Sequence, residues 1–487
     1  MLENDDKKEV TENKKAKKEH RKVSIWAVII TAVVAIAIGA GGMYAYMYNE
    51  VKEAQTVSAS MKKIQTIYET LYYNYYKKTS AKKLQNGAIN GMIDALDDQF
   101  SEYMTKSEAE SLNDTISGSF VGIGVEVQKS GNYIKVIAPI DNTPAAKAGL
   151  KAKDLITKVN GKSIKGVSLE KVISTIRGKK GTYVTLTIQR DGSTFTKKVK
   201  RATIPVSTVY GNIDSKNKTV GYIKVTTFST NTAKEFKKEI KILRKKGAKS
   251  FVIDVRDNPG GLMNVAISMA SMFVKYGKNV MQVQGRNGET EVYKSSKSYS
   301  GGFKVTEPTV VLVNSGSASA SEIFASALNE SANIKLIGTK TYGKGTVQTT
   351  QEYKDGTELK LTIDKWLTAN GTWINKKGIE PTIKSDWPSV AYLAAINTDK
   401  SYQEGQVSKQ VKKIQKILKY LGYFTGTSNG YYGSDTKDAI AKFQSDNGIT
   451  STGTADKATV IKMESKLSSK LSNQDNAYKT ALKQLTN

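Results

Sequence analysis

Polar and apolar positions divide most sharply at the start of the chain. Residues 1–23 are polar and rich in lysine, whereas residues 24–47 contain no charged side chain. A helix rises about 1.5 Å per residue, so this uncharged stretch is long enough to cross roughly 30 Å of hydrocarbon. Because basic flanking residues stay on the cytoplasmic side, we predict a cytoplasmic basic tail at 1–23, a transmembrane anchor at 24–47 and an extracytoplasmic remainder.

A cleaved signal peptide is the alternative to an uncleaved anchor. Signal peptides have an apolar region of roughly 7–15 residues and a cleavage site of the small-x-small type. The apolar region here is longer, and no clear site of that type follows it. We therefore expect a single-pass protein of the cell membrane with most of its chain outside the cytoplasm.

The periodicity changes after the anchor. Residues 48–105 repeat apolar side chains every three or four positions, as at Ile64, Ile67 and Leu71, which is typical of helices. A face packed in the core of the same chain explains this spacing, and so does a helical arm that joins two copies; we predict a dimerisation arm. Residues 106–204 change to short alternating strands separated by Gly and Asn-Gly turns, which predicts a β-rich domain.

The second half of the chain mixes strands and helices. Within residues 205–398, the runs 251–255 and 309–313 are continuous apolar strands, and each precedes a helical pattern, at 263–273 and 321–328. That order predicts an α/β core with crossover helices. Residues 404–467 return to helical spacing and predict a small all-α domain. The polar tail, residues 468–487, is predicted to be a frayed helix, and the fold class is a multidomain α+β protein.

Composition limits the chemistry of this chain. Its 487 residues suggest about three domains beyond the anchor. The formal charge of +29 favours anionic surroundings, although a solvated basic surface without a dedicated partner explains it as well. Nucleic acid is an unfavoured partner, because the chain has no compact aromatic-basic signature and is predicted to lie mostly outside the cytoplasm.

Histidine and cysteine are nearly absent. The chain has one histidine, His20, in the predicted cytoplasmic tail, and no cysteine. The extracytoplasmic part therefore cannot use a Ser-His-Asp triad, a Cys-His pair or most zinc sites. Serine with lysine remains as a catalytic pair, and we expect no metal and no organic cofactor.

Two segments supply that pair. Ser319 lies between an apolar strand and a helix, and with Glu322 it forms the pattern of a capping box, which is its structural explanation. The free amides at the helix start, including that of Ala320, would also face any negative charge that develops there. Lys344 lies between two glycines before an uncharged run. Most lysines are surface cations, and this one can act as a base only if burial lowers its pKa.

Four blocks of sequence resemble the carboxyl-terminal processing proteases, which are Ser/Lys endopeptidases. The blocks are Asp-Val-Arg-Asp-Asn-Pro-Gly-Gly at 254–261, the segment 313–328, Tyr-Gly-Lys-Gly-x-x-Gln at 342–348, and Lys-Gly-Ile-Glu-Pro at 377–381. The resemblance covers roughly residues 60–390. It implies that Ser319 is the nucleophile, since the family's interval to the lysine lands on it rather than on Ser317 or Ser321. It also implies that Lys344 is the general base.

The same resemblance assigns supporting roles. It implies that Gln348, placed one helical turn after Lys344, orients the lysine. It further implies an oxyanion hole made by the amide of Ala320 and an amide of the glycine turn, either Gly260 or Gly261.

The β-rich domain, residues 106–204, resembles a PDZ domain in its Gly118–Gly124 block and in Pro-Ala-Ala-Lys-Ala-Gly-Leu at 144–150. A glycine-rich turn before a strand can offer amides to a peptide carboxylate, while the strand edge pairs with the peptide. We expect the carboxylate loop at Val121, Gly122, Ile123 and Gly124, with Ile123 lining an apolar pocket. Arg177 matches the position that couples PDZ occupancy to the active site in related proteases; a surface salt bridge is its structural explanation.

The domain at 404–467 resembles the small helical peptidoglycan-binding domain of many wall enzymes, and the loop 429–433 is where we expect a glycan contact. The combined prediction is a membrane-anchored extracytoplasmic serine endopeptidase that recognises C-terminal tails of protein substrates and is tethered to the cell wall. A catalytically silent PDZ and wall-binding scaffold is the alternative. A peptidoglycan hydrolase is a further one, but no paired acidic residues or metal-ligand cluster stands out to support it.

Overall fold

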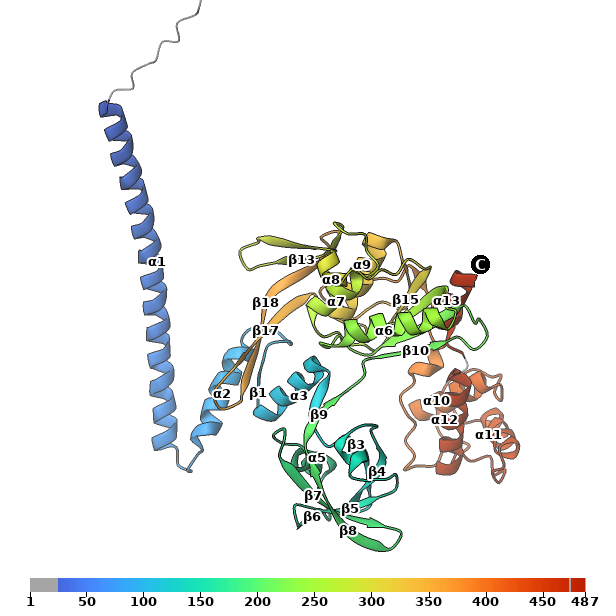
Figure 1. Ribbon diagram of the computed structural model, residues 1–487. Helices are drawn as coiled ribbons and strands as arrows, with labels where there is room; N and C mark the ends of the chain where they lie inside the picture. The colour runs from blue at the N-terminus through green and yellow to red at the C-terminus, as the bar shows by residue number, and fades with distance from the viewer. Residues whose placement is uncertain (1–24, 473, 487) are drawn as a thin grey trace, which may run out of the picture. The chain divides into compact units, whose positions relative to one another are not determined.

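The computed structural model describes residues 25–472 and 474–486, so the predicted cytoplasmic tail and His20 lie outside the described residues. The chain divides into two compact units, Met1–Ala95 and Leu96–Asn487. The first unit contains two helices, α1 (Ile25–Asn74) and α2 (Ala81–Asp94), and α1 is the long blue helix of Figure 1. Within α1, the segment Thr31–Tyr48 is long and apolar enough to cross a membrane, and none of it is buried.

The predicted arm also leaves its apolar side chains in solvent. In the half of α1 that follows Tyr48, the exposed residues include Val57, Met61, Ile64, Ile67 and Leu71. These side chains recur every three or four positions along one continuous helix. The packing within a single described chain therefore leaves this stripe uncovered.

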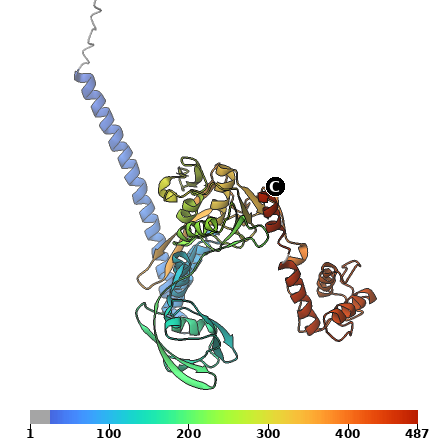
Figure 2. The same cartoon turned by 45° about the vertical axis from the view of Figure 1, so that its right-hand side comes forward.

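The second unit begins with a β-rich module. Its strands pair in the order β3-β4-β5-β7-β8, with β6 beside β5, so β3 is an edge strand. Figure 2 shows these teal and green strands curling around a short helix. The bounds are β3 (Val125–Ser130), β4 (Tyr133–Pro139), α4 (Pro144–Lys147), β5 (Leu155–Val159), β6 (Lys162–Ser163), α5 (Leu169–Ile176), β7 (Tyr183–Arg190) and β8 (Ser193–Lys200). Before the module lies α3 (Lys106–Ser117), and β2 (Ser119–Gly122) pairs with β9 (Ala202–Pro205) where the chain enters and leaves it.

A six-stranded sheet forms the centre of the α/β core. Its order is β10-β11-β12-β15-β16-β19, and all neighbours are parallel except β10. Its elements are β10 (Val209–Ile213), β11 (Val220–Val225), α6 (Thr232–Lys245), β12 (Ser250–Asp254), α7 (Met263–Ala270), β15 (Thr309–Val313), α9 (Ala320–Ala332), β16 (Lys335–Gly338) and β19 (Ile383–Lys384). The predicted crossover helices are confirmed.

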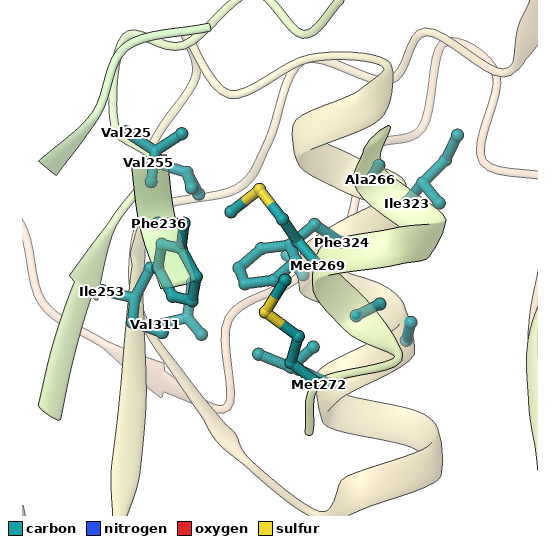
Figure 3. Packing of buried hydrophobic residues seen from close by; sticks show 14 of the residues in the cluster. Val225, Phe236, Ile253, Val255, Ala266, Met269, Met272, Val311, Ile323 and Phe324 are labelled. Atoms are coloured by element: carbon teal, nitrogen blue, oxygen red, sulfur yellow. The ribbon is translucent and has the colours of Figure 1, made fainter. Parts of the chain in front are cut away.

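Both faces of this sheet are buried, and alternation along the strands decides which residue faces which layer. Ile253 and Val311 pack with Phe236 of α6 and Phe324 of α9 in one large cluster (Figure 3). Val252 and the other alternate residues point to the opposite face, into a second cluster. Continuous apolar strands are expected when a parallel sheet is covered on both sides.

A second sheet stands beside the core and carries the lysine segment at its edge. Its order is β1-β18-β13-β14, with β17 paired to β18. The bounds are β1 (Glu102–Met104), β13 (Asn279–Gln284), β14 (Thr290–Lys294), β17 (Thr346–Glu352) and β18 (Glu358–Thr368). Two short helices complete this part of the chain: α8 (Lys297–Ser300) follows β14, and η1 (Ser389–Tyr392) follows β19.

The C-terminal part has a helical module followed by a separate last helix. The module comprises α10 (Lys409–Leu421), α11 (Ser434–Asp446) and α12 (Lys457–Ser472) around its own core. The last helix, α13 (Asn476–Thr486), packs on the core sheet, and its Ala477 and Ala481 are buried there. The prediction of a frayed tail is therefore wrong from Asn476 onward, because apolar side chains at helical spacing give this tail a face to bury.

Candidate active site

Ser319 occupies a strained turn between β15 and α9. Its φ of +54° and ψ of −116° lie outside the regions that suit a residue with a side chain. Such strain costs about 1–3 kcal/mol and is concentrated at functional sites. Ser319 is half-buried, whereas Ser317 and Ser321 are fully buried and donate their hydroxyls to Val255 O and Asn258 O, each at 2.8 Å. The two alternative serines therefore have structural partners.

The glycine turn after β12 lies directly against this serine. A Cβ added to Gly260 would lie 2.9 Å from both Ser319 Cβ and Ala320 N, and 2.7 Å from Ala318 O. Ala318 N also donates to Asn258 O at 3.1 Å. Gly260 has a φ of +105° and no room for a side chain, so glycine is required here.

Glu322 joins the serine turn to the lysine segment. Its side chain is fully buried, and Oε2 accepts the main-chain N–H groups of Ser319 at 2.8 Å and Lys344 at 2.9 Å. Oε1 accepts the Thr341 hydroxyl at 2.6 Å and the Gly343 N–H at 2.7 Å. The capping box predicted for Ser319 is thus present, and the same carboxylate also holds the second segment. The sequence pattern indicated the capping role alone.

Lys344 is half-buried, and burial lowers the pKa of its ammonium to about 8. This value already includes the nearby charge of Lys360, which also lowers the pKa, and the charges of Asp98, Glu102 and Glu322, which raise it. The ring of Phe100 lies 4.6 Å from Lys344 Nζ and shields it on one side. Among the residues that the structure describes, none forms a hydrogen bond with this Nζ, and in particular the Ser319 hydroxyl does not.

Gln348 lies on strand β17, and the prediction that it follows Lys344 by one helical turn is wrong. The residues after Gly345 pair with β18, which makes them a strand. Gln348 Nε2 donates to Thr346 Oγ1 at 2.8 Å and to Thr362 Oγ1 at 3.1 Å. Its connection to Lys344 in this structure is indirect, through Thr362.

The turn at residues 98–101, which we call the clasp, was missed by sequence reasoning. The Asp98 carboxylate accepts the Ser101 hydroxyl at 2.7 Å and the Phe100 N–H at 3.2 Å, and Thr362 N donates to Ser101 Oγ at 3.0 Å. Hydrogen bonds from Thr362 and Ser101 lower the Asp98 pKa against the opposing effect of burial. The clasp therefore brings one ring and one negative charge to Lys344 from about 240 residues earlier in the chain.

The candidate oxyanion donors differ in their present partners. Gly260 N donates to Asn258 Oδ1 at 2.9 Å. Neither Gly261 N nor Ala320 N forms a hydrogen bond with another residue in the described part of the chain. Among the described residues these two amides are therefore unpaired, whereas the amide of Gly260, the glycine that packs against the Ser319 turn, already has a partner.

The structure agrees only in part with the predicted carboxylate-binding loop at residues 121–124. Val121 and Gly122 belong to β2, while Ile123 is 1% exposed and packs in the module core, so its side chain lines no open pocket. The N–H groups of Ile123 and Gly124 have no partner among the described residues. Thr143 closes the loop by donating its hydroxyl to Gly124 O at 2.9 Å.

Arg177 forms a surface salt bridge, which is the structural role that the sequence allowed for it. Its Nη1 lies 2.6 Å from Asp114 Oδ2 of α3, and its guanidinium stacks 4.9 Å from the ring centre of Phe120. Both partners lie outside the six-stranded sheet of the β-rich module, next to the chain segments that connect the module to the core.

The helical module separates its two loop tyrosines. Tyr432 is buried and donates its hydroxyl to Gly453 O at 2.8 Å, whereas Tyr431 is 49% exposed. Gln415 holds the loop by accepting Gly430 N–H at 2.9 Å and donating to Tyr431 O at 2.8 Å. Of the two tyrosines, Tyr431 is therefore the one whose ring is exposed to a ligand.

The domain matches agree with the architecture. Residues 219–385 match peptidase family S41, residues 121–200 match a PDZ domain, residues 407–463 match a peptidoglycan binding domain, and residues 36–108 match the activating protease CtpB N-terminal domain. An α/β peptidase core with an attached PDZ domain is the class of protein that these matches define.

Full-length relatives place the chain within that class. It is 46% identical over 459 residues to the carboxy-terminal processing protease CtpA of Bacillus subtilis, covering 94% of this chain and 97% of the relative. It is 41% identical to a "Probable CtpA-like serine protease" of Staphylococcus haemolyticus, over 92% of this chain and 88% of the relative. A protein of the same name from Staphylococcus saprophyticus is 39% identical, over 95% of this chain and 92% of the relative. The chain belongs to the carboxy-terminal processing proteases of peptidase family S41.

Proposed function

We propose that this protease is a membrane-anchored extracytoplasmic endopeptidase in which Ser319 is the nucleophile and Lys344 the general base. The observation that carries the proposal is the Glu322 carboxylate, whose Oε2 accepts main-chain N–H groups of both residues. It couples the strained serine turn to a lysine whose pKa burial lowers to about 8. Near physiological pH a lysine with that pKa keeps a minor but usable fraction in the neutral form, which is the form that can act as a base.

The reaction would follow the acyl-enzyme route. Neutral Lys344 accepts the Ser319 proton as the hydroxyl oxygen attacks the substrate carbonyl. The resulting oxyanion accepts hydrogen bonds from the N–H groups of Ala320 and Gly261. The protonated lysine then gives its proton to the leaving amine, and water hydrolyses the acyl-enzyme by the same steps. Each oxyanion donor contributes about 3–4 kcal/mol of barrier lowering.

Ser319 and Lys344 would form their hydrogen bond when substrate binds. Catalytic hydrogen bonds are often absent in ligand-free structures and tighten in the complex. Lys344 Nζ has no competing hydrogen bond among the described residues, so nothing there opposes this movement. Gln348 would contribute by holding Thr362 and with it the clasp, rather than by touching the lysine.

The PDZ domain would select substrates by their C-terminal tails. Strand β3 is a sheet edge and can pair with an added peptide strand. The N–H groups of Ile123 and Gly124 would donate hydrogen bonds to the terminal carboxylate of the peptide. Arg177 would couple this binding to the protease, because its partner Asp114 lies on α3, and the end of α3 contacts the core through Ser229 Oγ and Thr115 O at 2.6 Å.

The remaining parts would position the enzyme in the cell envelope. The Thr31–Tyr48 segment would anchor it in the membrane by a single helix, and the exposed stripe from Val57 to Leu71 would pair with a second copy. The helical module would hold peptidoglycan, with Tyr431 as a glycan contact. We expect no cofactor, because serine and lysine suffice for the chemistry.

Cleavage of an unfolded protein with an apolar C-terminal tail by the detergent-solubilised full chain tests the proposal. We expect Ser319→Ala and Lys344→Ala to abolish cleavage while retaining the wild-type melting temperature to within a few degrees. Matched controls are Ser315→Ala, in the same loop and exposed, and Lys340→Ala, whose ammonium pairs with Glu380 at 2.9 Å. Cleavage that survives in Lys344→Ala would reject the dyad.

A further inference from the structure

The last helix of the chain completes the protease core. Helix α13 covers the sheet face opposite to α6, α7 and α9, where its apolar side chains meet Val252, Val310 and Leu312. In both views it is the dark red helix beside the core (Figures 1 and 2). Since residues 407–463 match the peptidoglycan binding domain and α13 follows them, that module is inserted within the protease fold rather than appended to it.

A bidentate ion pair connects the start of α13 to the segment that precedes the glycine turn. Arg256 Nη1 and Nη2 lie 2.8 Å and 2.7 Å from the two carboxylate oxygens of Asp475. Its Nη2 also donates to Asp254 Oδ2 at 2.7 Å, and the Arg256 side chain is 11% exposed. Planar two-point pairs of this kind fix orientation as well as distance.

Arg256 is only a few residues from the reacting groups. The Lys224 ammonium donates to Arg256 O at 2.6 Å, and the Asp257 N–H donates to Asn314 Oδ1 at 2.9 Å. Asn258 then accepts Gly260 N–H through Oδ1 and Ala318 N–H through its carbonyl oxygen. The segment that follows Arg256 is therefore hydrogen-bonded to both the glycine turn and the Ser319 turn.

We infer that Arg256 is a positioning residue and that α13, through Asp475, holds the glycine turn in the geometry that the oxyanion requires. The inference rests on the proposed role of Gly261 and Ala320. It makes the segment after the wall-binding module a functional part of the protease. A shift of about 1 Å in an oxyanion donor is enough to cost a large part of its effect.

Asp475→Ser in the full chain tests this inference. Asp475 Oδ1 also accepts Tyr478 N–H at 2.9 Å as the cap of α13. Serine caps a helix as well as aspartate does but is too short to reach Arg256. We expect kcat on a short peptide substrate to fall about tenfold, with KM within twofold of wild type. Asp475→Glu keeps the charge and should restore kcat to within threefold.

Tyr478→Phe is the matched control on the same helix. It removes the Tyr478 hydroxyl that donates to Asp214 Oδ2 at 2.8 Å and leaves the Arg256 pair intact. We expect wild-type kcat for this variant. Wild-type kcat in Asp475→Ser, or an equal loss in Tyr478→Phe, would overturn the inference.

Amide hydrogen exchange separates this inference from the proposed function. Asp475→Ser should speed exchange at Gly260 about tenfold or more, and Tyr478→Phe should leave it unchanged, whether or not cleavage is detected. Unchanged exchange at Gly260 in Asp475→Ser rejects the inference, whereas activity that persists in Ser319→Ala rejects the catalytic assignment instead.

Discussion

Two lysines in the described part of the chain have a pKa that burial lowers, and their contrast shows what the proposed base requires. Burial lowers the pKa of both Lys304 and Lys344. The Lys304 ammonium donates to Ser271 O at 2.7 Å and to Val274 O at 2.5 Å, and it lies 3.9 Å from the ring centre of Tyr276. Those acceptors stabilise the charged form, so Lys304 is a structural cation.

Lys344 is held differently. Its main-chain N–H is fixed by Glu322 and its carbonyl oxygen by Trp366 Nε1 at 2.7 Å, while its ammonium has no hydrogen-bond partner among the described residues. The backbone is thus fixed and the reactive nitrogen left available. Burial alone does not make a base; burial without acceptors for the charged form does.

The largest effect expected from this contrast is the loss of the base. Lys344→Ala should lower kcat by at least about 10³-fold, because a general base of this kind contributes about 10²–10⁴-fold and no other described side chain can replace it. Steady-state cleavage of a tail-bearing substrate measures it. A loss below tenfold would show that another group takes the proton.

The second expected effect concerns the carboxylate that holds Lys344. Glu322→Gln replaces one of two acceptor oxygens by a donor, which then faces main-chain N–H groups and leaves them unpaired. We expect kcat to fall about 100-fold and the melting temperature to drop. Activity close to wild type would mean that Glu322 caps α9 without organising the site.

The pH dependence of cleavage is a further test of the difference between Lys344 and Lys304. In the proposed mechanism Lys344 acts in its neutral form, so kcat should rise with pH through a midpoint near its pKa of about 8. Because the folded pKa lies below the ordinary value of 10.5, the folded state binds fewer protons than the unfolded state between these pH values. Stability should therefore rise with pH across that window, from the Lys344 contribution.

Phe100→Ala shifts this profile by a smaller amount. Removing the ring lets water reach the Lys344 ammonium, which raises its pKa and moves the rising limb of the pH profile to higher pH. At pH 7.5 we expect about three- to tenfold lower kcat, with recovery at high pH. Phe100→Leu, which keeps an apolar cover, should behave like wild type, and an unshifted profile in Phe100→Ala would exclude shielding by the clasp.

The smallest catalytic effect is expected at the other lysine. Lys304→Met keeps the aliphatic stem and removes the two hydrogen bonds to carbonyl oxygens, at a cost of about 1–3 kcal/mol in the free energy of unfolding. Activity per folded molecule should stay within twofold of wild type. Chemical denaturation and cleavage assays on the same preparation separate the two effects.

Sequence patterns identified the candidate catalytic segments but not the groups that surround them. Ser319 and Lys344 stand in contiguous motifs, and the alternating and helical periodicities predicted the α/β core correctly. Gln348 was placed on a helix because a four-residue interval suits one, whereas pairing with β18 makes the segment a strand. The tail was predicted to be a frayed helix, and the packing of α13 on the core was not predicted, because its apolar face is short and has a partner only in the sheet that it covers.

The sequence by itself determined the available chemistry. With no cysteine and with its one histidine in the predicted cytoplasmic tail, the part of the chain after residue 47 has serine and lysine as the candidate nucleophile and base. The tertiary structure decided which lysine is desolvated without a partner, because Phe100, Asp98 and Glu322 reach Lys344 from distant segments. It also decided that the C-terminal helix belongs to the protease. A pKa depends on every group within several ångströms, and those groups are brought together by folding alone.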